Sequence, residues 1–253
     1  MYWAVPELQI ERPICFQCSM KKVALRRPLT RDKKQPFDIG VVFRRIRKAI
    51  EPFPKAAMFQ LAEEGFSSPF EQLVACLISV RTRDETTIPI ARRLFSSVAR
   101  TPMNIARLPV ERIGELIHGT SFRGVKAGHI RDIAMRTVQH YDGKLPCDEA
   151  ILRSFAGVGP KCAHLVLGIA CKKSAISVDI HVHRVTNRWG FVSAPTPEQT
   201  MLVLEDKLPK RFWIEINRLL VPFGKHICMP TLPKCATCPV LNMCRQVGVT
   251  RHR

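Results

Sequence analysis

Apolar residues recur at helical spacing from about residue 41 onward. In VVFRRIRKAI, Val42, Ile46, Ala49 and Ile50 share one face of a helix, and basic residues occupy the other faces. Prolines at positions 52 and 54 follow, and a proline interrupts a helix because it has no amide hydrogen to donate. This stretch therefore predicts an amphipathic helix over about 41–51.

Start and stop signals divide the rest of the chain into further helices. In SSPFEQLVACLIS, Ser68 is a helix cap, Pro69 takes the first helical position and Glu71 completes a capping box. Comparable starts occur at Thr101-Pro102 and Thr196-Pro197, and comparable ends at Asp142-Gly143 and Gly190. Alternating polar and apolar residues, the pattern of a strand, are almost absent. The sequence therefore predicts an all-α fold.

The charge balance adds a class of partner to this helical pattern. Lysine and arginine number 40 against 21 acidic residues, for a net charge of +19, and such an excess most often serves a polyanion such as nucleic acid. A basic surface that only faces solvent is the alternative.

No apolar run approaches the roughly 20 residues of a membrane span, and the N-terminus lacks the apolar core of a signal peptide. We therefore expect a soluble, intracellular protein: in the cytoplasm or nucleoid of a bacterium, or in the nucleus or mitochondria of a eukaryote.

Residues 1–37 show no sustained periodicity and are rich in lysine and arginine, so we expect a disordered basic extension. Cys15 and Cys18 within it form a single C-x-x-C pair, which fits unpaired thiols better than a metal or redox site. The chain holds ten cysteines in all. Without a secretion signal, these favour metal ligands or buried thiols over disulfides.

Four cysteines near the C-terminal end carry the clearest metal signal. Cys228, Cys235, Cys238 and Cys244 follow the spacing C-x6-C-x2-C-x5-C. Four thiolates within one short loop need a cationic centre to hold them together, so the loop predicts zinc or an iron–sulfur cluster. The uneven spacing favours the iron–sulfur cluster, with a structural role.

Basic residues surround this loop. Lys225 and Lys234 are candidate contacts for DNA phosphates, which the loop would present on a stiff support. A solvated rim with no bound partner is an equal alternative for each of them.

The stretch DEAILRSFAGVGPKCAHLVLGIA predicts two helices joined by a tight turn. Gly157 and Gly159 are expected to supply unusual backbone angles and, with Val158 between them, to bring amides close to a DNA phosphate. Pro160 suits the first position of the second helix, which places Lys161 in its first turn.

Lys161 is a candidate nucleophile. The positive end of the helix dipole and apolar neighbours such as Phe155 and Leu165 favour the neutral amine that a nucleophile needs. A nucleotide-binding P-loop does not fit, because Phe155 and Cys162 replace its required glycine and hydroxyl residue. A lysine that only touches phosphate remains an alternative on these residues alone.

Asp179 lies 18 residues beyond Lys161, directly before a helix that ends near Gly190. It is a good N-cap, and as a carboxylate opposite the amine it can also take a proton or stabilise positive charge on a sugar. The two roles are compatible.

Taken together, the glycine hairpin with Lys161, Asp179 in VDIHVHR and the four-cysteine loop resemble the endonuclease III family of DNA glycosylases. FSSPFEQLVACLIS also resembles that family's first barrel helix, and the match runs from about residue 40 to 246. The resemblance implies a six-helix barrel over 62–173 and a [4Fe-4S] cluster domain from 38–61 and 174–248. It implies that Lys161 is the nucleophile, Asp179 the catalytic carboxylate and the four cysteines the cluster ligands.

The resemblance also implies an activity. The family removes oxidised pyrimidines from double-stranded DNA and then cuts the abasic site by β-elimination, and we expect the same of this chain, acting as a monomer. The alternatives are a related glycosylase for mismatched or alkylated bases, or a non-catalytic module that binds damaged DNA.

One departure concerns DNA contact: Arg81 stands where the family usually has a glutamine that fills the gap left by the flipped nucleotide. Arginine can fill this gap, but it changes the contact with the opposite base.

Overall fold

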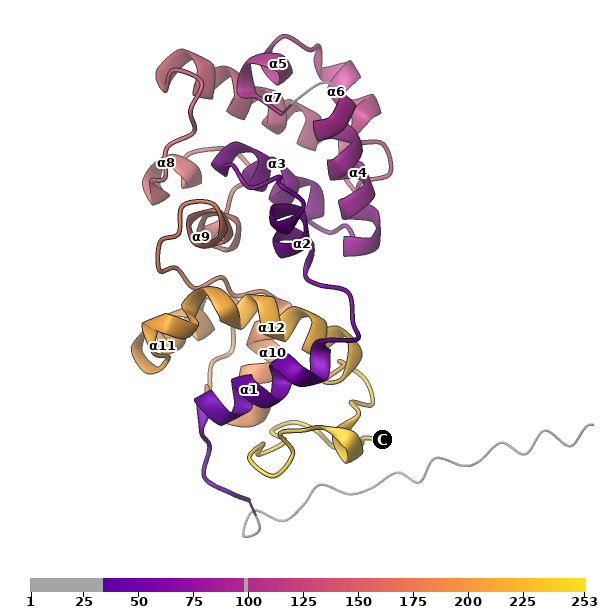
Figure 1. Ribbon diagram of the computed structural model, residues 1–253, viewed down its shortest axis with the longest axis vertical. Helices are drawn as coiled ribbons and strands as arrows, with labels where there is room; N and C mark the ends of the chain where they lie inside the picture. Colours follow the sequence, from indigo (N-terminus) through magenta and orange to yellow (C-terminus); the bar gives the residue numbers. More distant parts are fainter. Residues whose placement is uncertain (1–33, 98–99) are drawn as a thin grey trace, which may run out of the picture.

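The computed structural model describes residues 34–97 and 100–253, and within these ranges the chain consists of helices joined by turns and loops, with no sheet. The helices form two lobes, one above the other in Figure 1, each around its own hydrophobic core. This confirms the predicted all-α, two-lobed architecture. No described helix is both long and apolar enough to cross a membrane.

The first lobe contains the helices from α2 to α9. They are α2 (Ala57–Glu63), α3 (Pro69–Ser79), α4 (Asp84–Ser97), α5 (Pro102–Ala106), α6 (Val110–Leu116), α7 (Arg123–His140), α8 (Glu149–Arg153) and α9 (Pro160–Ile169). The capping box predicted at α3 is present: Ser68 Oγ accepts from the Glu71 amide, and Glu71 Oε2 accepts from the Ser68 amide at 3.0 Å. Apolar α3 is buried at the centre of this lobe.

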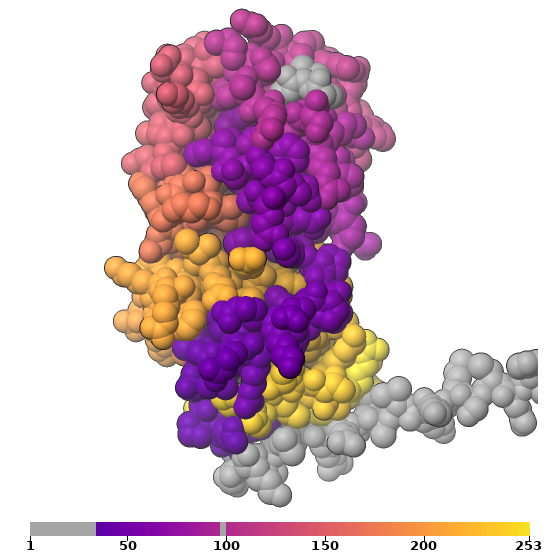
Figure 2. Space-filling model, viewed as in Figure 1, coloured from indigo at the N-terminus to yellow at the C-terminus, as the bar shows by residue number. Residues whose placement is uncertain are grey.

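The second lobe joins the two ends of the described chain. It contains α1 (Ile39–Ile50), α10 (Ile180–Trp189), α11 (Pro197–Lys207), α12 (Trp213–His226) and the short 3-10 helices η2 (Lys210–Phe212) and η3 (Cys235–Thr237). In the space-filling view, indigo α1 lies against the orange and yellow C-terminal segments (Figure 2). The apolar face predicted for α1 is buried there, with Val42 and Ile46 fully covered.

The lobe boundaries differ from those we expected. The apolar residues of α2 pack in the first core, so the change of lobe falls near residue 55 rather than at 61. Of the expected extension, residues 1–33 with Cys15 and Cys18 lie outside the described residues, whereas 34–37 belong to the second lobe. Phe37 stacks on Phe191 with ring centroids 5.0 Å apart, and this long-range contact has no counterpart in the local pattern.

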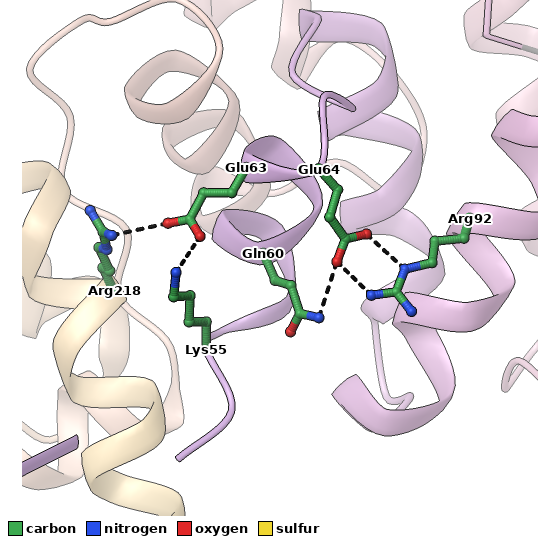
Figure 3. A network of polar contacts seen from close by, with 6 residues as sticks. All are labelled: Lys55, Gln60, Glu63, Glu64, Arg92 and Arg218. Atoms are coloured by element: carbon green, nitrogen blue, oxygen red, sulfur yellow. Dashed lines mark hydrogen bonds and ion pairs between the residues drawn. The ribbon is translucent and has the colours of Figure 1, made fainter. Parts of the chain in front are cut away.

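Polar contacts around α2 connect the lobes. Figure 3 shows Glu63 bound both by Lys55 of the linker and by Arg218 of α12, the latter at 3.0 Å. Beside it, Glu64 is bound by Gln60 and by Arg92 of α4, and hydrogen bonding to Arg92 lowers the pKa of Glu64. Of these contacts, the Glu63–Arg218 pair joins the two lobes, whereas the Glu64–Arg92 pair lies within the first lobe. An exposed ion pair contributes at most about 1 kcal/mol.

Two disulfides were not expected. Cys76 of α3 is bonded to Cys162 of α9, and Cys147 is bonded to Cys171. The expectation that the cysteines outside the C-terminal loop are unpaired thiols was therefore wrong for these four. Because Cys162 lies near the start of α9 and Cys171 just after its end, the disulfides fix this helix at both ends.

Candidate active site

The predicted helix–turn–helix is present at the surface of the first lobe. Helix α8 begins at the cap Asp148, the turn follows, and α9 begins at Pro160. The two glycines differ, contrary to our expectation. Gly157 has φ +80°, in the left-handed region, whereas Gly159 is extended with φ −93° and ψ 179°. Only Gly157 therefore needs to be glycine for its backbone angles.

Apolar side chains anchor the turn to the core of the first lobe. Phe155 and Val158 are buried, and the guanidinium of Arg136 lies 4.4 Å from the centre of the Phe155 ring. The Val158 amide donates to the Phe155 carbonyl oxygen at 3.2 Å. Any contact of Val158 with a ligand is thus made by its backbone, because its side chain is directed into the core.

Lys161 lies in the first turn of α9 and is half-buried. Among the described residues, no hydrogen bond or ion pair holds its Nζ. Its carbonyl oxygen accepts from Ser177 Oγ at 3.1 Å. The backbone around the amine is thus fixed, by this hydrogen bond and by the disulfide at Cys162, while the amine itself remains available.

Asp179 is the N-cap of α10, as predicted. Its Oδ1 accepts from the amides of His181 and Val182, each at 2.9 Å, and Oδ2 has no hydrogen-bond partner among the described residues. The segment that leads to it is fastened to α9 by Ser177, two residues earlier, and to α12 by Asn217, whose side chain donates to the Ser177 carbonyl. The carboxylate and the amine are thus carried by two segments joined at Ser177.

His181, beside Asp179, is packed against α12. A Cβ atom at Gly224 would lie 2.8 Å from its Nδ1, so only glycine allows this approach. Burial lowers the pKa of His181, and Arg184 adds to this effect. Burial therefore favours the neutral form of the ring, while Asp179 opposes this effect.

Arg81 and Phe122 form an exposed pair at the open ends of α3 and α7. Both have left-handed backbone angles, with φ +53° and +56°. The Arg81 guanidinium lies over the Phe122 ring, 5.5 Å from its centre, and Phe122 is 58% exposed. We call these two side chains the exposed pair. Arg81 was expected from the sequence but Phe122 was not, because nothing in TSFRG distinguishes a surface aromatic residue from a core one.

The two candidate lysines near the cysteine loop have different surroundings. Lys225 Nζ lies 2.7 Å from Asp84 Oδ2 and 3.7 Å from Glu85, so it joins α12 to the first turn of α4. A DNA phosphate would have to compete with these carboxylates. Lys234 is half-buried, and the described residues offer its ammonium no carboxylate partner.

The four C-terminal cysteines line one cavity in the second lobe. None of them is in a disulfide. Burial raises the pKa of Cys238 to about 12 and that of Cys244 to about 11. The described chain contains no group of three or more His, Cys, Asp or Glu residues placed to hold a single metal ion.

Polar groups are directed toward this cavity. Arg188 Nη1 lies 3.6 Å from Cys228 Sγ and donates to the Met229 carbonyl oxygen. Gln246 is 4% exposed; its Oε1 accepts from Lys34 at 3.1 Å, whereas its buried Nε2 has no hydrogen-bond partner. Lys34 thus sets the orientation of this amide and turns its NH2 group away from itself.

Comparison with known proteins identifies the family. A model of the HhH-GPD superfamily of base excision DNA repair proteins matches residues 74–210. An endonuclease III of Thermotoga maritima is 39% identical over 192 residues, covering 74% of this chain and 90% of the relative. The chain belongs to the endonuclease III family. The endonuclease III of Bacillus subtilis is 32% identical over 184 residues, or 71% of this chain and 82% of the relative.

Solved endonuclease III structures have the same fold. A trapped covalent intermediate of endonuclease III with DNA aligns over 81% of this chain and 96% of its own, at 28% identity and a TM-score of 0.66. A non-covalent endonuclease III–DNA complex aligns over 81% of this chain and 95% of its own, at 28% identity and a TM-score of 0.67. The endonuclease III family match thus extends across both lobes, which carry Lys161 and Asp179 respectively.

Proposed function

We propose that the protein is a base excision repair glycosylase with abasic-site lyase activity, and that it removes oxidised pyrimidines from double-stranded DNA. One observation carries this most: a half-buried lysine with a free amine begins the helix after a glycine turn, and Ser177 connects it to the segment that presents Asp179. The neighbouring structures of this fold include endonuclease III bound to DNA, which supports double-stranded DNA as the partner.

In this reaction the Lys161 amine attacks C1′ of the damaged nucleotide. The bond from C1′ to the base breaks, and its electron pair leaves with the base, which takes up a proton. The Asp179 carboxylate offsets the positive charge that develops on the sugar and accepts the proton lost by the attacking amine. The nitrogen lone pair then forms a double bond to C1′ as the C1′–O4′ bond breaks and O4′ takes up a proton, which leaves the opened sugar as a Schiff base. A general base then removes a C2′ proton, and the 3′ phosphate departs as the bond from C3′ to its oxygen breaks, which completes the β-elimination.

DNA contacts follow from the surface around this amine. In the turn at Gly157, Val158 and Gly159, the two glycine amides are offered to a phosphate at the start of α9, where the helix dipole favours an anion, while the Val158 amide stabilises the turn through the Phe155 carbonyl oxygen. The exposed pair is suited to enter the duplex, because it offers a cation and a flat aromatic ring at the surface that can fill the space left by an extruded nucleotide. Lys234 and, once released from Asp84, Lys225 add phosphate contacts at the second lobe.

A [4Fe-4S] cluster fits the cavity lined by Cys228, Cys235, Cys238 and Cys244. Two observations support the fit: four unpaired thiols share one cavity, and the Gln246 NH2 group is buried there beside the Cys235 thiol, where it can donate to a sulfur atom. When bound, such a cluster supplies the positive centre that holds four thiolates together. In this protein it would stiffen the loop that carries Lys234. All the groups named here come from one chain, so we propose that a monomer is active.

The proposed activity is tested on a panel of duplexes that carry an oxidised pyrimidine, a mismatch, an alkylated base or a plain abasic site. We expect base release from the oxidised pyrimidine and strand cleavage at the abasic site. Release only from mismatched or alkylated bases would replace the proposed substrate. Salt-sensitive binding without any turnover would indicate a non-catalytic DNA-binding protein.

Asp179→Asn separates the carboxylate's charge from its capping role. Asparagine is as good an N-cap as aspartate, so the midpoint of thermal unfolding should remain within about 2 °C. Loss of the carboxylate should lower single-turnover base release by about a hundredfold or more, the usual scale of acid–base and charge stabilisation. Unchanged base release would remove Asp179 from the mechanism.

A further inference from the structure

A buried ammonium lies between the two turns that carry the exposed pair. Lys126, in the first turn of α7, is only 5% exposed. Its Nζ donates to the carbonyl oxygens of Ile78 and Val80, each at 2.7 Å, and to Thr82 Oγ1 at 3.1 Å. These three acceptors use all three of its N–H groups. All three are neutral, and no carboxylate in the described chain pairs with this charge.

This position is unfavourable for a cation in two ways. Burial lowers the pKa of Lys126 to about 8, which means that the surroundings oppose its charge. The start of α7 is also the positive end of that helix's dipole. The carbonyl oxygens at the end of α3 offset part of this cost. A residue placed only to fill space would be apolar here, so the three hydrogen bonds indicate that Lys126 serves to fix the turn after α3.

The turns that Lys126 connects hold two residues in strained conformations. Left-handed angles are unfavourable for residues other than glycine, and both members of the exposed pair have them. Ser121 completes the connection: its Oγ donates to the Arg81 carbonyl oxygen at 2.7 Å, and its amide donates to Thr82 Oγ1 at 3.2 Å. Thr82 Oγ1 therefore accepts from both Lys126 and Ser121, and the two turns share one set of hydrogen bonds.

We propose that Lys126 is a positioning residue for nucleotide extrusion. By tying the turn of Arg81 to that of Phe122, it holds the exposed pair in a single arrangement, so that both side chains enter the duplex together. This inference rests on the proposed function, in which the pair fills the space left by the extruded nucleotide. Lys126 touches neither the sugar nor the base.

The test measures insertion separately from chemistry. A duplex carries an uncleavable tetrahydrofuran abasic analogue opposite 2-aminopurine, whose fluorescence rises when it loses its stacking. The fluorescence is read at saturating protein, so that affinity does not affect the amplitude. Lys126→Met keeps the length of the side chain and removes the donors. Lys172→Met is the matched control, because Lys172 also donates to a carbonyl oxygen at a helix end, that of Ile169 at 2.7 Å, but its ammonium makes no hydrogen bond to either turn among the described residues.

We expect the parent and Lys172→Met to give the same rise, and Lys126→Met to give less than about half of it, because losing charge-assisted hydrogen bonds shifts the population away from the ordered pair. Equal amplitudes in parent and Lys126→Met, or equal losses in both variants, would overturn the proposal. If Lys126→Met does not fold, Ser121→Ala replaces it, with a smaller loss expected and an unchanged amplitude as the contrary result.

Borohydride trapping of the parent on a natural abasic duplex is run in parallel. Trapping without any rise in fluorescence would overturn the role of Lys126 and leave the proposed function intact. Absence of trapping would overturn the proposed function itself.

Discussion

The two glycines of the hairpin should fail in different ways when each is replaced by alanine. At Gly157 the backbone is left-handed, and a Cβ atom would also lie 2.7 Å from Nδ1 of His129. At Gly159 the backbone is extended and a Cβ atom would meet nothing within 4 Å. The first glycine is thus required by the fold, while the second leaves open space above the turn for a ligand.

The magnitudes follow from these geometries. Gly157→Ala costs about 1–2 kcal/mol for the left-handed angle and about 1 kcal/mol for displacing His129, while the less flexible unfolded chain returns about 0.5 kcal/mol. A net loss near 2 kcal/mol lowers the unfolding midpoint by about 4–8 °C in a protein of this size. Gly159→Ala has no such cost and should leave the midpoint within about 2 °C. Its methyl group occupies the space through which a phosphate approaches, so DNA affinity should fall about tenfold.

Thermal unfolding and DNA binding at one fixed salt concentration measure the two effects. The reasoning is refuted if Gly159→Ala lowers the midpoint as much as Gly157→Ala does. It is also refuted if Gly159→Ala binds an abasic-analogue duplex as tightly as the parent, because the turn would then not approach DNA.

Three further outcomes are expected. Lys234→Ala should reduce the slope of log affinity against log salt by about one, whereas Lys225→Met should change it less, because Lys225 is already paired; equal changes would contradict this. Reduction of the disulfides, whose cysteines are 86 and 24 residues apart, should cost about 5 and 3 kcal/mol of unfolding free energy by chain entropy; urea unfolding with and without reductant measures this, and no difference would argue against both bonds. The third concerns pH: the pKa of Lys126 is about 8 when folded and 10.5 when exposed, so the unfolded chain binds more protons between these values. Between pH 7.5 and 10.5, the unfolding free energy of the parent should therefore rise by up to about 3 kcal/mol relative to that of Lys126→Met. A decrease in this difference with rising pH would contradict the prediction.

Local signals in the sequence were enough to predict most helices. The capping box at α3 depends on residues three apart, and both of its hydrogen bonds are present. The left-handed Gly190 ends α10 for the same kind of local reason. A cap or a proline acts within one turn of the chain, so its effect can be deduced without the fold.

Contacts between distant segments could not be predicted in this way. The bond between Cys76 and Cys162 joins positions 86 residues apart, and the pairing of Lys225 with Asp84 joins the two lobes. The pattern of each segment is compatible with many partners, and only the packed structure selects one. Lys126 is the clearest case, since its charge gave no reason to expect burial.

The candidate site was predicted in part. Lys161 and Asp179 occur where the turn and the cap were expected, while their connection through Ser177 required the fold. The assignment of their chemical roles, and of the cysteines as cluster ligands, remains a prediction that measurement must test.

The most direct measurement of the central claim is the site of covalent attachment. The protein is incubated with a duplex that contains an abasic site, the Schiff base is reduced with borohydride, and the modified peptide is located by mass spectrometry. The account predicts that the sugar is attached to Lys161, and that Lys161→Gln gives no trapped product while it still binds the duplex. Attachment at another residue, or undiminished trapping by Lys161→Gln, would contradict it.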